Sequence, residues 1–381
     1  MTKILGDLLR RYFPALLLGG GIVASSPVMG QLRDFFFAAF PGYALRYIAM
    51  FLGAVAGALF LVALWRIREH RLLRYGGLLL VGGLLWLQVA GLARGMAQVD
   101  VVERFHVLEY GTLAALVYRG LRQRPTKAGW PELLLLPICA ATLAGVLDES
   151  AQRFFQLRVA DFHDVGLNAF AALVGVLFAA LLAPPPDRAP WRQGWPRVVR
   201  ALALTLLGLG LFAMAAHFGY EIVDPELGRF RSFHSAEELQ AAAIDRATRW
   251  AKKPPDGLDP WARKDLFLDE AARYTTYRNG GLDPKIHDYA AAWRANQILE
   301  KYYGPFLDVE GFRRTGKNRW PAEVLAEVQA KAGRPLPATF ESPVLRDHLV
   351  LIPKLPFLAG LLAVVGLLWA LAAALARRTL P

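Results

Sequence analysis

Polar residues able to do acid–base or headgroup chemistry recur at helical spacing within long apolar stretches of the chain. His106, Glu109 and Tyr110 stand at i, i+3 and i+4, which places them on one face of a helix. Glu149 and Gln152 are three residues apart at the end of the next apolar stretch. Because polar groups inside a membrane are costly, residues of this kind point to a functional site.

The connector and the following stretch extend this set. Arg158 lies in the connector, and Asp161, Asp164 and Asn168 follow at i, i+3 and i+7. All three groups fall at helix ends that belong on the same side of a bundle, so we expect them to meet in one layer near the headgroups. The candidate polar cluster is His106, Glu109, Tyr110, Glu149, Gln152, Arg158, Asp161, Asp164 and Asn168.

Several chemistries fit this cluster. Arg158 and Arg153 could hold a phosphate, while His106 and Glu109 relay a proton or receive a hydroxyl. Glu149 and Asp164 could form an acid and base pair. Alternatively, His106, Glu109 and Glu149 could hold a metal, although a His and a Glu three apart are a weak signal. The residues indicate no cofactor, and no catalytic residue is assigned.

Each residue also has a structural interpretation. Asp161 suits a helix N-cap and Asp164 suits a first-turn acid. Glu109 lies within an apolar run and should need a partner such as Arg158 or Arg104. Asn168 should likewise need a polar partner on another helix. A purely structural polar network is therefore the alternative to a shared site.

The elements that position these residues are long apolar blocks. Hydrophobic residues make up 55% of the 381 residues, and a helix that spans a bilayer needs about 20 apolar residues in succession. Backbone in lipid must bond to itself, which favours helices. The expected spans are Tyr12–Met29, Tyr43–Trp65, Tyr75–Ala93, Phe105–Leu121, Glu132–Leu147, Val165–Ala183, Val198–His217 and Phe357–Ala376. The first could instead be a signal peptide, because Ala24-Ser25-Ser26 resembles a cleavage site; we favour a helix.

Charge in the short loops predicts the orientation. The loop after the second span holds Arg66, Arg68, Arg71 and Arg74, whereas the loop before it holds only two arginines. By the positive-inside rule both termini face the cytoplasm, and the polar region between the last two spans faces outward. The net charge of +12 then lies in cytoplasmic loops. Because these basic residues form no single stripe, nucleic-acid binding is not expected.

The outer region is expected to be helical. Ser235-Ala236-Glu237-Glu238 predicts a capping box before an Ala-rich helix. Further helices are expected from Asp259-Pro260-Trp261 to about Arg278, ending at Asn279-Gly280-Gly281, then from Pro284 to Tyr303 and from Pro321 to Ala332. Acidic and basic residues are equal in number between Tyr220 and Leu345. The lone Cys139 excludes an intrachain disulfide, so packing alone must hold this region together.

The order of the polar residues resembles the VanZ-like family. The residues that carry the resemblance are His106-Val107-Leu108-Glu109-Tyr110, then Asp148-Glu149-Ser150-Ala151-Gln152, then Arg158, Asp164-Val165 and Asn168. Gly175 stands in a matching helix, and Ser26-Pro27 resembles the first helix of the family. The connector Phe155-Gln156-Leu157-Arg158 departs from the pattern, which has a Pro before the Arg. The resemblance covers about Met1 to Ala183 and leaves the rest of the chain unexplained.

The expected protein is therefore all-α, a polytopic membrane bundle of about eight spans with an extracytoplasmic helical domain between the last two. Residues 1–183 would form the VanZ-like core, 184–218 a cytoplasmic loop and seventh helix, 219–346 the outer domain, and 347–381 the last helix and tail. The resemblance implies a bacterial cytoplasmic-membrane protein of the cell envelope, but no reaction.

Three functions stay open for such a protein. The first is handling of membrane lipids or of a phosphate-bearing lipid carrier. The second is a membrane-embedded hydrolase or transferase that uses the same cluster. The third is a scaffold or assembly protein that binds a protein partner through residues 219–346.

Overall fold

The protein forms two compact units, each described by itself below. The computed structural model describes residues 2–91, 104–124, 128–156, 158–185, 194–253, 255, 262–309, 318–333, 336–337 and 339–378. The first unit comprises Met1–Gln152, Val159–Phe212 and Leu358–Pro381. The second comprises Arg153–Arg158 and Ala213–Phe357. Much of the expected cytoplasmic loop, residues 186–193, lies outside the described residues.

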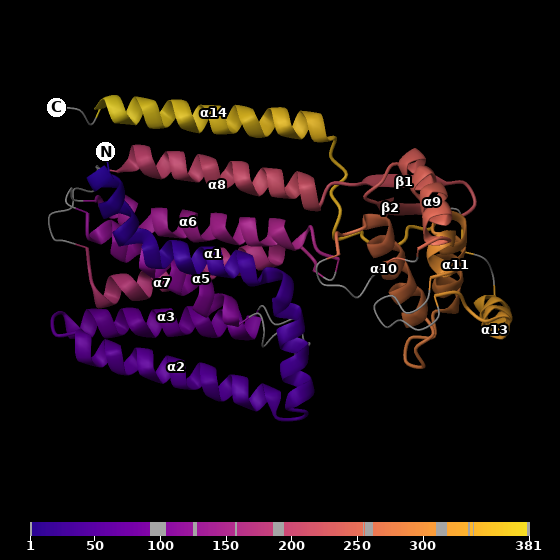
Figure 1. Ribbon diagram of the computed structural model, residues 1–381, viewed down its shortest axis with the longest axis horizontal. Coiled ribbons are helices and arrows are strands. Elements are labelled where there is room, and N and C mark those ends of the chain that lie inside the picture. Colours follow the sequence, from indigo (N-terminus) through magenta and orange to yellow (C-terminus); the bar gives the residue numbers. More distant parts are fainter. Residues whose placement is uncertain are drawn as a thin grey trace. The chain divides into compact units, whose positions relative to one another are not determined.

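The first unit is built of long helices (Figure 1). They are α1 (Thr2–Ala39), α2 (Ala44–Arg66), α3 (Arg71–Gly91), α5 (Phe105–Arg122), α6 (Trp130–Gln152), α7 (Phe162–Leu182), and most of α8 (Trp195–Ala216) and α14 (Lys354–Arg378). The expected end of the third span, Ala93, lies outside the part that the structure describes. The expected first span falls inside α1, whose helix also includes Pro14 and Pro27.

Six helices in the described part of the chain are long and apolar enough to cross a bilayer: α1, α2, α6, α7, α8 and α14. This supports a multi-pass membrane helix bundle. Helices α3 and α5 are not among them, and α5 carries Glu109, Arg119 and Arg122 within its 18 residues. The count of eight spans therefore stays a prediction.

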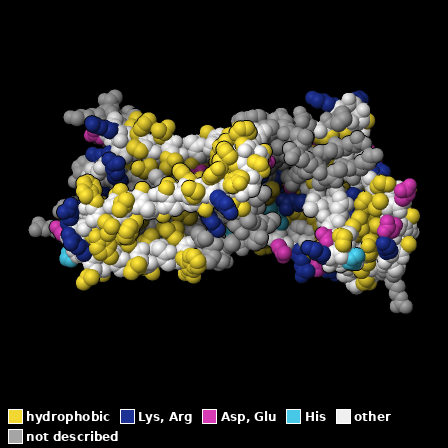
Figure 2. Space-filling model, turned by 90° about the horizontal axis from the view of Figure 1, so that it is seen from below, with side chains coloured by type: hydrophobic (Ala, Val, Ile, Leu, Met, Phe, Trp, Pro, Cys, Tyr) yellow, Lys and Arg dark blue, Asp and Glu magenta, His cyan; other side chains and the backbone are white. Residues whose placement is uncertain are grey.

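The outward faces of these helices are apolar. Figure 2 shows hydrophobic side chains gathered over the helical unit. Met50 is 70% exposed and Trp65 is 67% exposed on α2, and Leu367 on α14 is 71% exposed. Large exposed apolar surfaces are unusual on soluble monomers and mark contact with a membrane or partner. Their position on apolar helices of spanning length favours lipid.

Helices α5, α6 and α7 pack on one another, and α1 packs against α5 and α6. The closest approach joins α5 to α7 at two glycines. A Cβ atom on Gly175 would collide with the backbone of Gly111. Small residues of this kind let membrane helices come into backbone contact. The Tyr118 hydroxyl donates to the Ala183 carbonyl at 2.6 Å and joins the other ends of the same two helices.

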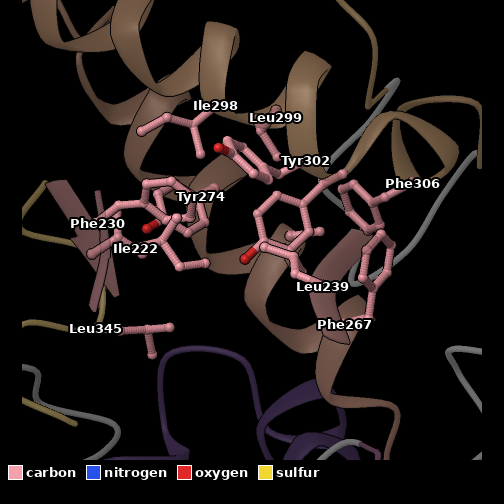
Figure 3. Packing of buried hydrophobic residues seen from close by; sticks show 14 of the residues in the cluster. Ile222, Phe230, Leu239, Phe267, Tyr274, Ile298, Leu299, Tyr302, Phe306 and Leu345 are labelled. Atoms are coloured by element: carbon pink, nitrogen blue, oxygen red, sulfur yellow. The ribbon is translucent and has the colours of Figure 1, made fainter. Parts of the chain in front are cut away.

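The second unit combines a hairpin with helices. Strands β1 (Tyr220–Asp224) and β2 (Gly228–Ser232) pair antiparallel, with Tyr220 opposite Ser232. The helices are α9 (Ala236–Trp250), α10 (Leu266–Gly280), α11 (Tyr289–Tyr302), α12 (Gly304–Leu307) and α13 (Ala322–Ala332). An aromatic core closes between them, as Figure 3 shows for Phe230, Phe267, Tyr274, Tyr302 and Phe306. This core holds the unit together without a disulfide.

This region also contains a hairpin, which precedes the first expected helix after Ser235. Residues 220–232 form the hairpin because their side chains alternate between exposed and buried, with Ile222 and Phe230 facing the core. The capping box at Ser235 is confirmed. Helix α10 ends at Gly280, within the stretch predicted to end it and two residues beyond the expected Arg278, and α13 ends at Ala332 as predicted.

Helix α10 begins later than predicted. Its expected start, Asp259-Pro260-Trp261, lies outside the described residues, and the helix itself begins at Leu266 with Asp265 as its N-cap. The residues just before it pair with the connector instead. The Gln156 backbone N–H donates to the Ala262 carbonyl at 2.9 Å, and the Lys264 N–H donates to the Phe154 carbonyl at 2.8 Å.

The connector that follows α6 belongs to the second unit. The Gln156 side chain is 1% exposed, and its Oε1 accepts from the Asp265 N–H at 2.6 Å. The Arg158 carbonyl accepts from Lys264 Nζ at 2.8 Å. The Arg153 guanidinium lies 5.1 Å from the centre of the Phe233 ring. Residues 153–158 were expected in the membrane core, and the structure groups them with residues 213–357 because of these contacts.

Candidate functional site

A hydrogen-bonded polar network closes one end of helices α5 and α6. The Tyr110 hydroxyl donates to Asp148 Oδ2 at 3.2 Å. Gln152 Nε2 donates to the same oxygen at 3.1 Å and to Glu149 Oε1 at 2.9 Å. All four side chains are buried, and Tyr110 and Glu149 are fully so. The network therefore draws together residues that are 38 positions apart in the chain.

The start of α7 completes this network. Glu149 Oε2 accepts from the backbone N–H of Asp161 at 3.0 Å. Asp161 Oδ1 in turn accepts from the His163 N–H at 2.9 Å, which makes Asp161 the N-cap of α7. The capping interpretation of Asp161 is thus confirmed. Asp164 lies in the first turn of α7, where an acid is favourable near the helix N-terminus.

Asn168 lies one turn further along α7 and is fully buried. Neither its Oδ1 nor its Nδ2 has a hydrogen-bond partner among the described residues. Gly145 of α6 makes the room for it, because a Cβ atom there would collide with the Asn168 side chain. A buried polar group left without a partner costs about 1–3 kcal/mol. The predicted polar partner of Asn168 on another helix is absent from the described part of the protein.

His106 and Ser26 resemble Asn168 in this respect. The His106 ring stacks on Tyr110 with centroids 5.8 Å apart and planes inclined by 14°. Its buried Nδ1 has no hydrogen-bond partner in the residues that the structure describes, and neither has the hydroxyl of Ser26 on α1. Glu109 is half-buried on the helix turn between His106 and Tyr110. Helices α1, α5 and α7 thus each carry a buried polar atom that has no hydrogen-bond partner among the described residues.

The hydrogen-bonded network contains four of the nine residues of the predicted cluster. Tyr110, Glu149, Gln152 and Asp161 share hydrogen bonds in the first unit. Arg158 is grouped with the second unit. The neighbouring Arg153 also belongs to the second unit, where burial lowers the pKa of its guanidinium and the charges of Asp269 and Glu270 oppose that shift.

Asp148 was missing from the predicted cluster, yet it is the acceptor that joins Tyr110 to Gln152. Its spacing carried the signal. Asp148 and Gln152 stand at i and i+4, which places them on one helix face.

Glu132 was also overlooked: it is 1% exposed near the start of α6, and its Oε1 pairs with Arg197 of α8 at 2.6 Å.

The site is rich in carboxylate oxygens, with Asp148, Glu149, Asp161 and Asp164 at or beside the network. Ionised carboxylates only accept hydrogen bonds, whereas the Asn168 amide can both donate and accept. The site therefore suits a group that donates hydrogen bonds, such as a hydroxyl or an ammonium. No group of three or more His, Cys, Asp or Glu side chains within the described ranges is arranged to hold a metal ion.

Comparison with known proteins identifies no relative. No family model, curated protein or solved structure matches the chain.

Proposed function

We propose that this chain is a VanZ-like membrane protein that handles an envelope lipid or lipid-linked precursor at its polar layer. In this proposal eight helices span the cytoplasmic membrane of a bacterium, with both termini in the cytoplasm and residues 219–346 outside. The excess of arginine in alternate loops supports the orientation. The order of polar residues from His106 to Asn168 supports the family.

The observation that carries the functional proposal is Asn168. A buried amide without a protein partner destabilises the bundle. Such a residue is retained most readily where a bound molecule supplies the missing hydrogen bonds. Asn168 packs against Gly145 of α6, one helical turn before Asp148 and Glu149 of the network. The exposed apolar helix faces favour a ligand that reaches this layer from the bilayer.

The chemistry of the layer narrows the ligand. The two arginines first considered for phosphate recognition, Arg153 and Arg158, pack within the second unit. The carboxylates of the network, Asp148, Glu149 and Asp161, accept hydrogen bonds. The ligand group that fits them is a headgroup hydroxyl or ammonium, held by carboxylates on one side and by the Asn168 amide on the other.

Native mass spectrometry of the protein released from lipid nanodiscs tests this proposal. Asn168→Leu keeps the volume of the side chain and removes its polar atoms. We expect the wild-type protein to retain a lipid adduct and the variant to lose it. Because the variant no longer buries an unpaired amide, it should also be more stable, by about 1–3 kcal/mol. Loss of binding together with a gain in stability distinguishes a ligand site from a packing site.

Thr205→Val is the matched control, since it also removes a polar atom from a buried position without changing volume. The Thr205 hydroxyl already donates to the Ala201 carbonyl at 2.8 Å on α8. This control should keep the adduct and gain no stability. An Asn168→Leu protein that keeps its adduct, or that unfolds at a lower temperature, would show that Asn168 is structural and would end the lipid proposal.

A further inference from the structure

A groove in the second unit lies along one face of α11. It has a volume of about 460 Å³ and is lined by Glu226, Leu227, Trp293, Asn296, Gln297, Glu300, Lys301 and Leu325. Trp293, Asn296, Gln297 and Glu300 stand at i, i+3, i+4 and i+7, so the helix repeat presents them as one stripe. Leu227 comes from the turn of the hairpin and Leu325 from α13. A volume of this size falls within the range of small-molecule sites, roughly 300–1,000 Å³.

The charged side chains of the groove are already paired. Arg319 donates to both oxygens of Glu300 at 2.7 and 2.9 Å. Lys301 Nζ lies 2.7 Å from Asp224 Oδ2 and 3.7 Å from Glu226 Oε2. Because every charged side chain of the groove already has a partner of opposite charge, the groove offers little attraction for an ionic ligand.

The neutral groups of the groove are left for a ligand. The fully buried Arg278 donates from Nη1 to Asn296 Oδ1 at 2.8 Å, which fixes that carboxamide with its NH₂ group unused. In the described part of the chain, neither the Asn296 Nδ2 atom, the Gln297 amide nor the Trp293 indole N–H makes a hydrogen bond to protein. Trp293 and Gln297 are half-buried. The groove thus presents one aromatic face and two carboxamides.

Arg278 shows that this arrangement is held rigidly. Its guanidinium also donates to Asn279 Oδ1 at 3.2 Å and to the Asn318 carbonyl at 2.6 Å, and lies 4.4 Å from the Trp320 ring centre. Burial lowers the pKa of this arginine to about 10, while the charge of Glu300 opposes that shift. A costly buried cation that orients a groove amide favours a positioning role, because a preorganised side chain loses less entropy on binding.

We propose that the groove binds an N-acetylated oligosaccharide. The flat apolar face of Trp293 suits a sugar ring. The Asn296 NH₂ group offers donors, and the Gln297 carboxamide offers both donors and an acceptor; these groups match an acetamido group and neutral hydroxyls. Binding here is independent of the polar layer in the first unit and adds an interaction to the proposed lipid function.

Ligand-observed NMR titration of the full-length protein in nanodiscs tests this inference. The sample contains no maltoside detergent, because the sugar headgroup of that detergent would compete for the groove. The probe is N,N′,N″-triacetylchitotriose, and trialanine tests for peptide binding. We expect saturable binding of the sugar. Trp293→Ala should weaken it roughly tenfold or more, and Gln297→Ala should weaken it severalfold. Gln240→Ala, the same change on the exposed face of α9, should leave affinity unchanged.

Any of three results would overturn the inference. The first is absence of saturable binding by the sugar. The second is sugar binding that Trp293→Ala and Gln297→Ala leave intact. The third is preferential binding of trialanine at the same residues, which would make the groove a peptide site. Thermal unfolding of each variant shows whether the second unit is still folded. Gln297→Ala should preserve the fold because that half-buried side chain makes no hydrogen bond to the described residues.

Discussion

The two units each bury a polar network, and the networks differ in how completely they are satisfied. In the second unit the fully buried Glu270 accepts from the Ser232 hydroxyl at 2.7 Å, the Phe233 N–H at 2.7 Å and the Tyr303 hydroxyl at 2.6 Å. His234 Nδ1 lies 3.2 Å from the same carboxylate. In the first unit, the equally buried Asn168 has no partner among the described residues.

This difference separates a structural network from a candidate binding site. A satisfied buried carboxylate fixes the elements around it, since each donor would lose its partner if the elements moved. Glu270 in this way ties the end of β2 to α10 and α11. An unsatisfied buried amide has no such structural benefit and stabilises the protein only when something binds. We therefore expect Glu270 to stabilise the second unit and Asn168 to contribute little to the stability of the first, and three substitutions probe the two networks.

The largest effect is expected from Glu270→Ala. The change strands four hydrogen-bonding groups in the core of the second unit, and breaking a buried charged network of this kind costs roughly 3–5 kcal/mol. In denaturant, hydrogen exchange measured by mass spectrometry should be much faster in α10 and α11 of the variant than in the same helices of the wild-type protein.

Glu327→Ala, which breaks an exposed i,i+4 pair with Lys331, serves as control. It should cost no more than about 0.5 kcal/mol. Equal effects of the two changes would refute the structural role of Glu270.

A smaller effect is expected from Gly175→Val. The new side chain would force α7 away from the backbone of Gly111, and overpacking typically costs about 1–3 kcal/mol. Because α7 carries Asn168, the lipid adduct should weaken as well. Gly166→Val is the matched control on the same helix, since a Cβ there meets no atom within 4 Å. In thermal unfolding of the protein in nanodiscs, the midpoint temperature should be lower for Gly175→Val and unchanged for Gly166→Val. A similar loss for both variants would mean that the α5–α7 contact does not define the site.

The sequence predicts a multi-pass helix bundle, and six of the eight expected spans coincide with helices long and apolar enough to cross a bilayer, because long apolar runs are a strong local signal. It also predicts local devices such as the Asp161 cap and the Ser235 capping box, which depend on residues a few positions apart. It does not predict that Arg158 joins the second unit, since that follows from contacts with Lys264, more than 100 positions away. Charge alone had suggested Arg158 as a partner for Glu109.

The hairpin and Asp148 show two further limits. Two five-residue strands alternate too briefly to stand out beside helices. The role of Asp148 depends on Tyr110 of another helix, and which faces of two helices meet is a matter of packing. Packing at Gly111 and Gly175 sets that geometry, and a single glycine in a helix carries no such information by itself.

The smallest effect is expected from His234, and it tests whether the Glu270 network is satisfied by charge as well as by hydrogen bonds. Burial opposes the charged form of His234, but the hydrogen bond and charge of Glu270 outweigh it and raise the pKa above its usual value of about 6.5. Glu238 also raises this pKa, and Arg246 lowers it. A raised pKa in the folded state means that protonated His234 stabilises the fold. That stabilisation is fully present below about pH 6.5 and is lost as the pH rises through the folded-state pKa.

The second unit of the wild-type protein should therefore lose on the order of 1 kcal/mol or less of stability between pH 5.5 and pH 9 through this group. His234→Gln keeps a donor near Glu270 but cannot titrate, so it should remove that slope. Denaturant unfolding at both pH values measures the difference. A slope unchanged in His234→Gln would mean that the histidine meets Glu270 as a neutral donor. The Glu270 network would then be held by hydrogen bonds alone, without a contribution from the charge of His234.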